Sequence, residues 1–345
     1  MSELKSTDVQ EAAQEFDKSD LAQTFDRLQT KGGRALSEFS EEPFAGDTDS
    51  AGEHEARTLW GDALRRLSKN YLAMAALVWI LIVITATITA DLWVPQNFGD
   101  PTFIDTATAA QRSLQPPSAE HPFGTDNMGR DLFGRVIYGA RVSLTVGFVA
   151  TALAFAAGIT VGAIAGYAGR WVDSLLMRLT DIVLSFPYLL MVILVMAVLP
   201  PNVRGAWPVA LAIAAFSWGA FARLFRSSVL SAKENDYVMA ARALGASTGR
   251  IIFRHILPNA IAPALVIATM TVGGVILTES ALSFLGLGIQ PPDISWGRMI
   301  EDGRRFLAVQ PQLVLYPGFA ILTTVLSFML LGDGVRDALD TKSKD

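Results

Sequence analysis

The feature that most constrains the fold of this chain is a series of long apolar stretches. Each approaches the roughly 20 residues with which a helix, rising about 1.5 Å per residue, crosses a hydrocarbon core of about 30 Å. Six occur, at about 71–93, 142–168, 180–199, 207–226, 259–285 and 313–332. Because lipid offers no hydrogen-bond partner to an open backbone amide, the sequence predicts an all-α, polytopic membrane bundle of six transmembrane helices.

The composition agrees with a membrane protein. Of the 345 residues, 51% are hydrophobic and 18% are charged, whereas a soluble domain carries about 25% charged residues. The chain contains no cysteine, which excludes disulfides, thiolate metal sites and a cysteine nucleophile within it. Its three histidines, His54, His121 and His255, lie far apart in the sequence and lack the HExxH spacing, so no metal site is predicted.

Residues 1–57 differ from the rest of the chain. They contain 14 acidic and 6 basic residues, a net charge of −8, whereas the remainder has a net charge of +3. The segment 37–55 is rich in Ser, Glu, Asp and Gly and has too few apolar side chains to form a core. We therefore predict a largely disordered acidic extension over 1–57 and a transmembrane domain over 58–345. The acidic charge gives no reason to expect nucleic-acid binding.

Basic residues near the span ends predict the orientation. With the N-terminus in the cytoplasm, 14 Lys and Arg residues lie in the inside segments and 8 in the outside segments. Because cytoplasmic connections carry an excess of basic residues, both termini are predicted to be cytoplasmic. Two outside connections, 94–141 and 286–312, are long and contain Pro, Gly and Trp, which favours ordered surface loops.

The largest inside connection, 227–258, has a helical pattern. Asp236 is predicted to cap a short helix, and Gly245 is predicted to end it in a left-handed conformation. The apolar face of this helix consists of Tyr237, Ala240, Ala241 and Leu244. A second helical piece is predicted through Ile251, Ile252 and His255 to Leu257 and Pro258. By itself the pattern indicates an amphipathic helix presented to the cytosol.

In kind and spacing, the residues Ala240-Ala241, Gly245 and His255-Ile256-Leu257-Pro258 resemble the EAA loop of ATP-binding-cassette importer permeases. In that family the loop forms a coupling helix that lies in a groove of a cytoplasmic ATPase. Met239 stands where the family has Glu. The resemblance implies an ATPase-coupling role for the loop 233–258. The residues concerned are Asp236, Tyr237, Met239, Ala240, Ala241, Leu244, Gly245, His255, Leu257 and Pro258.

Three further stretches resemble the C-type permease subunit of dipeptide and oligopeptide importers. They are GTDNMGRDLFGRVIYGARVSL at 124–144, ESALSFLGLGIQPPDISWGRMI at 279–300 and LGDGVRDALD at 331–340. The resemblance implies a MetI-like permease core of five helices plus one N-terminal helix, located in the inner membrane. It also implies ATP-driven import of di- or oligopeptides. A permease for nickel or another small solute of the same family, and an ion-coupled secondary transporter, are the alternatives.

The same resemblance implies the partners of the chain. They are a second permease in a heterodimer, two cytoplasmic ATPase subunits and an extracytoplasmic solute-binding protein, all around a lipid-embedded core. The sequence contains no Gly-x4-Gly-Lys-Ser/Thr motif, so the backbone cradle and lysine that bind ATP phosphates are absent. We therefore predict a transport subunit rather than an enzyme, with no cofactor on this chain and with ATP and Mg on the ATPases.

Glu279 lies near the outer end of the fifth predicted span, where a carboxylate is costly unless it is bound. Two interpretations stay open: Glu279 lines the substrate path, or it is a hydrogen-bonded anchor for the turn 286–292. Gly158, Gly162 and Gly166 recur every four residues and form a smooth helix face. This face could pack within the subunit or against the partner permease.

Asp126 and Asp131 flank Gly129 in the first outside connection. Two carboxylates so close in sequence could suggest acid–base chemistry. Helix capping or turn formation explains them better, because Asp side chains accept hydrogen bonds from nearby backbone amides. We therefore predict structural roles for both residues.

Overall fold

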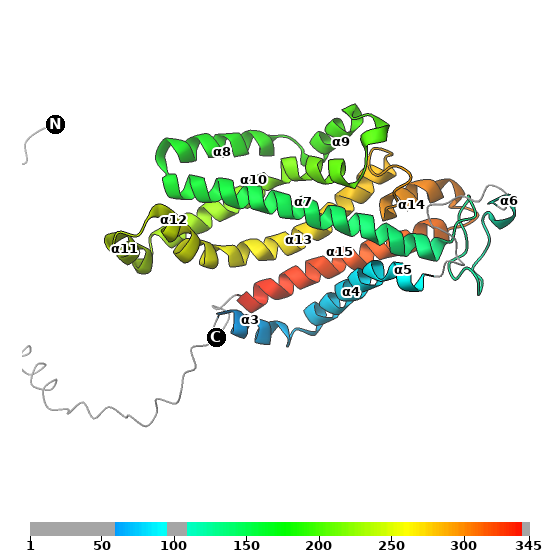
Figure 1. The fold of residues 1–345 in the computed structure, drawn as a ribbon, viewed down its shortest axis with the longest axis horizontal. Coiled ribbons are helices and arrows are strands. Elements are labelled where there is room, and N and C mark those ends of the chain that lie inside the picture. Colours follow the sequence, from blue (N-terminus) through cyan, green and yellow to red (C-terminus); the bar gives the residue numbers. More distant parts are fainter. Residues whose placement is uncertain (1–58, 95–108, 340–345) are drawn as a thin grey trace, which may run out of the picture. The chain divides into compact units, whose positions relative to one another are not determined.

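The structure is a computed structural model that describes residues 59–94 and 109–339. The chain divides into two units, Met1–Arg57 and Thr58–Asp345, and the extension predicted over 1–57 lies outside the described residues. In the second unit, long helices lie side by side along one direction (Figure 1). The described part of the chain contains no strand, only an isolated bridge between Thr125 and Asp131. The all-α prediction is confirmed.

The described α-helices are α3 (Leu59–Leu67), α4 (Tyr71–Ile88), α5 (Ala90–Trp93), α6 (Ala109–Arg112), α7 (Leu132–Ala168), α8 (Arg170–Ser185), α9 (Tyr188–Val198), α10 (Ala206–Lys233), α11 (Asp236–Ala243), α12 (Thr248–Ile251), α13 (Leu257–Phe284), α14 (Trp296–Gly303) and α15 (Gln312–Leu339). Two 3₁₀ turns, Pro201–Val203 and Arg304–Phe306, and a π-helical turn, Ile252–Ile256, complete the helical structure of the described segments.

Five of these helices are long and apolar enough to cross a membrane: α4, α7, α10, α13 from Ala260 onward, and α15. The pair α8 and α9 makes a sixth span if the two are counted together. Each predicted apolar stretch is therefore found, but several of its bounds change. Helices α10 and α15 continue to Lys233 and Leu339, past the predicted ends at 226 and 332, because polar residues extend a helix readily once it leaves the apolar core.

The second span begins ten residues earlier than the predicted start at 142. Asp131 has an extended backbone, and its side chain accepts a hydrogen bond from the Gly134 amide at 2.6 Å, which caps α7 at Leu132. Two arginines in the first turns of α7 lower its apolar character and obscured this start in the sequence. Arg135 is buried and Arg141 pairs with Asp91 at 3.1 Å, so both charges have partners in the fold.

The third span is not the straight helix predicted at 180–199. Helices α8 and α9 form a pair that is bent by 77°. The bend lies at Phe186-Pro187, where Phe186 is extended, with φ −90° and ψ 141°. A proline disfavours the α conformation in the residue before it and supplies no amide for the helix, so the chain breaks here. The break was not predicted, because the stretch 180–199 is apolar on both sides of Pro187.

Helices α7 and α10 lie against each other along their length (Figure 1). A Cβ at Gly162 would lie 2.6 Å from the Ala222 carbonyl oxygen, and one at Gly166 would lie 2.9 Å from the Val229 side chain. At Gly158 it would overlap Phe221. Only glycine allows this approach. Of the two interpretations of the glycine face, the structure shows packing within the subunit.

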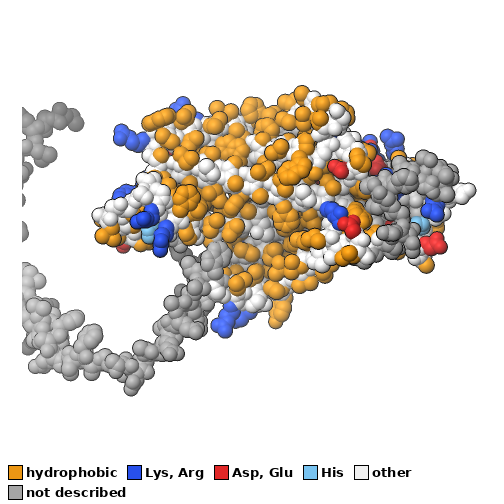
Figure 2. Space-filling view, in the orientation of Figure 1, with side chains coloured by type: hydrophobic (Ala, Val, Ile, Leu, Met, Phe, Trp, Pro, Cys, Tyr) orange, Lys and Arg blue, Asp and Glu red, His pale blue; other side chains and the backbone are white. Residues whose placement is uncertain are grey.

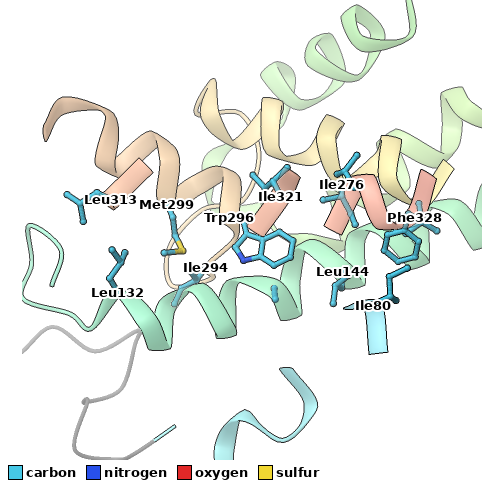
Figure 3. Packing of buried hydrophobic residues seen from close by; sticks show 13 residues of the cluster. Ile80, Leu132, Leu144, Ile276, Ile294, Trp296, Met299, Leu313, Ile321 and Phe328 are labelled. Atoms are coloured by element: carbon cyan, nitrogen blue, oxygen red, sulfur yellow. The ribbon is translucent and has the colours of Figure 1, made fainter. Parts of the chain in front are cut away.

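The connection 286–312, which was predicted to lie outside, folds back into the bundle through α14. Trp296 is 1% exposed, and its Nε1 donates a hydrogen bond to the Val136 carbonyl at 2.8 Å. Met299 and Ile321 lie close to it, together with Leu144 of α7 (Figure 3). Helix α14 is therefore part of the core and not a surface loop, whereas Val309 of the same connection is exposed.

Large apolar side chains also cover the outside of the bundle. Leu81 of α4 is 51% exposed and Leu322 of α15 is 62% exposed. On the visible face, hydrophobic side chains cover the middle, whereas Lys and Arg gather towards its ends (Figure 2). A bundle with this surface is stable in lipid, because its apolar belt avoids water there. The chain is therefore a membrane-spanning protein.

The two ends of the bundle carry different connections (Figure 1). Helices α11 and α12 lie at one end, which we call the α11 end. Helices α6 and α14 lie at the opposite end, which we call the α14 end.

Candidate functional site

The first candidate site is helix α11 at the α11 end. The prediction that Asp236 caps this helix is wrong. Asn235 is the N-cap, with φ −74° and ψ 144°, and it makes no side-chain capping hydrogen bond. Asp236 is the first helical residue, because the chain leaves its extended conformation at Asn235, one residue earlier than predicted. Its negative charge still lies where the helix dipole favours an acidic group.

Gly245 ends α11 as predicted. Its φ is +78°, a conformation that costs other residues about 1–2 kcal/mol. The turn is closed by hydrogen bonds from the Gly245 amide to the Arg242 carbonyl and from the Ala246 amide to the Ala241 carbonyl, both 3.0 Å. This arrangement satisfies carbonyls at the helix end. A Cβ at Gly245 would meet no atom of this chain within 4 Å, so the turn is open to a partner.

Most of the predicted apolar face of α11 points away from the bundle. Of that face, Leu244 is 88% exposed and Tyr237 41%, and the adjacent Met239 is 51% exposed. Ala240 is exposed and Ala241 is half-buried. An exposed apolar face on a helix of eight residues is typical of a surface that another protein covers.

Val238, which was not among the predicted site residues, is the buried residue of α11. It lies among apolar residues of α10, α12 and α13. Val238 and Met239 are both large apolar residues outside the predicted face, and the sequence did not show that Val238 is the buried one of the two.

The structure brings Tyr237 and His255 together. Their ring centroids lie 6.5 Å apart with an interplanar angle of 43°. His255 belongs to the π-helical turn, and Leu257 and Pro258 are the first two residues of α13. The second helical piece therefore does not stop at Pro258 but runs directly into the fifth span. A proline is tolerated in the first turn of a helix segment.

A groove lies beside the start of α11. It has a volume of about 400 Å³. Its lining is mostly polar, with hydroxyl and amide side chains and two alanines. The lining residues are Ser227, Ser228, Ser231, Ala232, Asn235, Tyr237 and Ala260. The groove extends the exposed surface of α11 onto α10 and α13.

The second candidate site is the buried carboxylate of Glu279, which is 0% exposed. It accepts hydrogen bonds from the hydroxyls of Ser143 at 3.0 Å and Ser283 at 2.7 Å. Ser283 Oγ in turn accepts one from the Ile289 amide at 3.1 Å. Glu279 thus holds the turn 286–292 through Ser283, which is the arrangement expected for the anchor.

An ionic network that the sequence did not predict lies near the α14 end. Asp126 lies 2.7 Å from Arg130 and 3.4 Å from Arg135, measured between the carboxylate Oδ2 and each Nε. Arg135 reaches Asp302 at 3.6 Å, and Arg298 reaches the same carboxylate at 3.1 Å. Burial raises the pKa of Asp302 above its ordinary value, against the opposite effect of the two arginines. The network links the connection that precedes α7 to α14.

Asp126 and Asp131 have the structural roles that were predicted. Asp126 accepts hydrogen bonds from the amides of Met128 at 2.8 Å and Arg130 at 2.9 Å, which forms a turn. Asp131 caps α7 and pairs with His121 at 2.9 Å. Burial raises the pKa of Asp131, although hydrogen bonds from Gly134 and His121 oppose the shift. In the part of the chain that the structure describes, no three His, Asp or Glu residues are grouped as a metal would require.

Comparisons with known proteins give two family matches and several similar sequences. Residues 158–345 match the family described as binding-protein-dependent transport system inner membrane component, and residues 58–117 match the N-terminal TM domain of oligopeptide transport permease C. The chain is 46% identical to the dipeptide transport system permease protein DppC of Alkalihalophilus pseudofirmus, over 85% of this chain and 93% of that protein. It is 40% identical to the oligopeptide transport system permease protein OppC of Bacillus subtilis, over 86% and 94%.

A solved structure of the MetNI methionine ABC transporter in an inward-facing conformation is also similar. Its matching chain is 20% identical, with a TM-score of 0.47, over 60% of this chain and 97% of that one.

Proposed function

Since the chain belongs to the family of binding-protein-dependent transport system inner membrane components, we propose that it forms half of the path by which di- or oligopeptides enter the cell. It does so as a permease subunit of an ATP-driven importer, and other chains hydrolyse the ATP. The names of its relatives support a peptide substrate, since one transports dipeptides and another oligopeptides. The alternatives of nickel transport and ion-coupled transport are not favoured by these relatives.

The observation that carries the coupling role is the exposure of α11. Leu244 and Met239 offer apolar surface at one end of a membrane bundle, next to the open turn at Gly245. In the importer this surface docks on a cytoplasmic ATPase through Tyr237, Met239, Ala240, Ala241 and Leu244. The α11 end is then cytoplasmic, and so are both termini.

The remaining partners follow from the same assignment. A second permease completes the path as a heterodimer, and two ATPases bind ATP and Mg on the cytoplasmic side. A solute-binding protein delivers the peptide at the α14 end. The ionic network of Asp126, Arg135 and Asp302 stabilises the segments that meet it.

Site-specific crosslinking tests the docking surface. The chain has no cysteine, so Ala243→Cys introduces one thiol on exposed α11. A short thiol-to-amine crosslinker is applied to native membranes, and the attached chain is identified by mass spectrometry. Val309→Cys is the matched control, because Val309 is 73% exposed near the α14 end.

Capture of a P-loop ATPase from position 243, but not from position 309, is the expected result. It supports both the docking surface and the orientation. Capture of the ATPase from position 309 reverses the orientation. Failure to capture any ATPase from well-inserted protein contradicts the proposal. Uptake of a radiolabelled dipeptide into cells with and without the chain tests the substrate separately.

A further inference from the structure

Helix α11 is attached to the bundle by very little side-chain contact. Val238 is 0% exposed, whereas its neighbours Tyr237 and Met239 are 41% and 51% exposed. No other residue of α11 is buried. A displacement of α11 can therefore reach the spans through apolar packing mainly at this one position.

Val238 belongs to a cluster that joins both spans next to the loop. The buried members of the cluster are Phe225, Val229 and Ala232 of α10, Val238 of α11, Ile251 of α12, Ile256 of the π-helical turn, and Ala260 and Ala264 of α13. Protein interiors are close-packed, so a shift of one member moves its neighbours or opens a void. Val238 thus contacts a core that belongs to α10 and α13 at once.

The other contacts of α11 are peripheral by comparison. The Arg242 guanidinium lies over the Tyr167 ring at 6.0 Å, and the rings of Tyr237 and His255 are 6.5 Å apart. Contacts at such distances on a protein surface contribute little, on the order of 1 kcal/mol or less each. These two contacts therefore add little to the attachment of α11 to the spans.

The chain between α11 and the fifth span is built to pass on a displacement. After Gly245, helix α12, the π-helical turn Ile252–Ile256 and α13 follow one another without a loop. Ile251 directly precedes that turn and Ile256 is its last residue. Both lie in the cluster with Val238. A π-helical turn is wider than an α-helical one and frequently occurs at functional positions.

We infer that Val238 is the positioning residue that transmits a displacement of α11 to α10 and α13. This inference rests on the proposed function, in which an ATPase moves α11. Val238 does not touch the ATPase or the substrate. It acts by filling the cluster between the two spans, so that they move together with α11.

The test measures transport and ATP hydrolysis in the same preparation. The complete transporter is purified through this chain, reconstituted in liposomes with its binding protein, and supplied with radiolabelled dialanine. The variants are Val238→Ala and the matched control Val209→Ala, which removes the same two methyl groups from a fully buried position of α10 in another cluster. Val238→Ile serves as the conservative variant that keeps the cluster filled.

For Val238→Ala we expect ATPase subunits in normal amount and ATP hydrolysis near the basal rate, but about fivefold or more fewer peptides transported per ATP, the low end of typical coupling between linked sites. Val209→Ala and Val238→Ile keep the wild-type ratio. If Val238→Ala does not assemble, Ile256→Val removes one methyl from the same cluster, and a smaller loss in the same ratio is expected.

Equal ratios in Val238→Ala, Val209→Ala and the wild type overturn the inference and leave the proposed function intact. A normal ratio in an assembled Ile256→Val transporter overturns it likewise when Val238→Ala cannot be tested. If the wild-type chain captures no ATPase, or its complex moves no peptide with ATP, the proposed function fails and the inference fails with it.

Discussion

Helices α11 and α14 have the same length, eight residues, but the fold holds them very differently. Helix α14 has a side-chain cap, since Ser295 Oγ accepts a hydrogen bond from the Arg298 amide at 3.2 Å. It buries Trp296, Gly297, Met299 and Gly303. Helix α11 has no side-chain cap and buries Val238 alone.

The two ends of the bundle therefore differ in how firmly their short helices are attached. A helix that is capped, ion-paired and packed on several residues moves only with the bundle. A helix that is attached at one buried position can be displaced at small cost and leaves its surface open. The α14 end is held firmly by the bundle, whereas α11 is held by one buried side chain, as the proposed coupling role requires.

The largest effect is expected from Trp296→Ala. Removing a buried aromatic side chain costs about 3–5 kcal/mol of folding stability, because the cavity closes only partly. The matched change on the other helix, Tyr237→Ala, should cost less than about 1 kcal/mol, since Tyr237 is 41% exposed. Thermal unfolding of the purified protein in lipid nanodiscs compares the two. Equal destabilisation by the two changes would contradict the conclusion that α14 is held more firmly than α11.

Glu279→Ala is expected to follow, with a loss of about 2–3 kcal/mol, because the hydroxyls of Ser143 and Ser283 lose a buried acceptor. Glu234→Ala is the control at the α11 end. Glu234 is exposed, so its loss should change stability by less than about 0.5 kcal/mol. The unfolding midpoints of the two variants measure this difference in stability. A stable Glu279→Ala variant that fails to transport would instead favour the substrate-path interpretation.

Gly245→Asp should cost about 1 kcal/mol of stability, because Asp tolerates a positive φ only with strain. No clash within the chain adds to it, since the space around Gly245 is open. Substrate-stimulated ATP hydrolysis should nevertheless be lost, because the new side chain projects into the docking surface. Membrane insertion is the control. Unchanged substrate stimulation would contradict the role of this turn.

The smallest effect is a pH dependence at the α14 end. Burial raises the pKa of Asp131 above its ordinary value, so the folded state binds the proton more tightly than the unfolded state does. The stability contributed by this group is therefore present at low pH and decreases as the pH rises through the folded pKa. Asp131→Asn should remove this decrease. The free energy of unfolding of both proteins, measured between about pH 4 and 7, tests this expectation. If the stability of the two proteins changes in parallel with pH, Asp131 is not the group responsible.

The parts of this fold that the sequence predicted depend on neighbouring residues. The turn at Gly245 and the cap at Asp131 involve residues within a few positions of each other. The apolar stretches gave each span, because hydropathy is a property of the segment itself. The break at Phe186-Pro187 is also local, and the proline was visible in the sequence. It was missed because apolar length was given more weight than the geometry of proline.

The candidate sites were less predictable. The exposed face of α11 was placed correctly in the sequence, but the buried side of that helix was not, because its packing partners come from α10 and α13. The ionic network was missed for the same reason, since Arg135 and Asp302 lie far apart in the chain.

The sequence by itself therefore determined that this chain crosses a membrane as helices, where α11 turns and which family it belongs to. These properties follow from composition, chirality and short-range spacing. Only the tertiary structure decided that Ser143, 136 residues away, binds Glu279, and that Val238 joins α11 to two spans. Such contacts depend on which helices pack together, and close packing lets a single buried side chain connect segments that local sequence leaves independent.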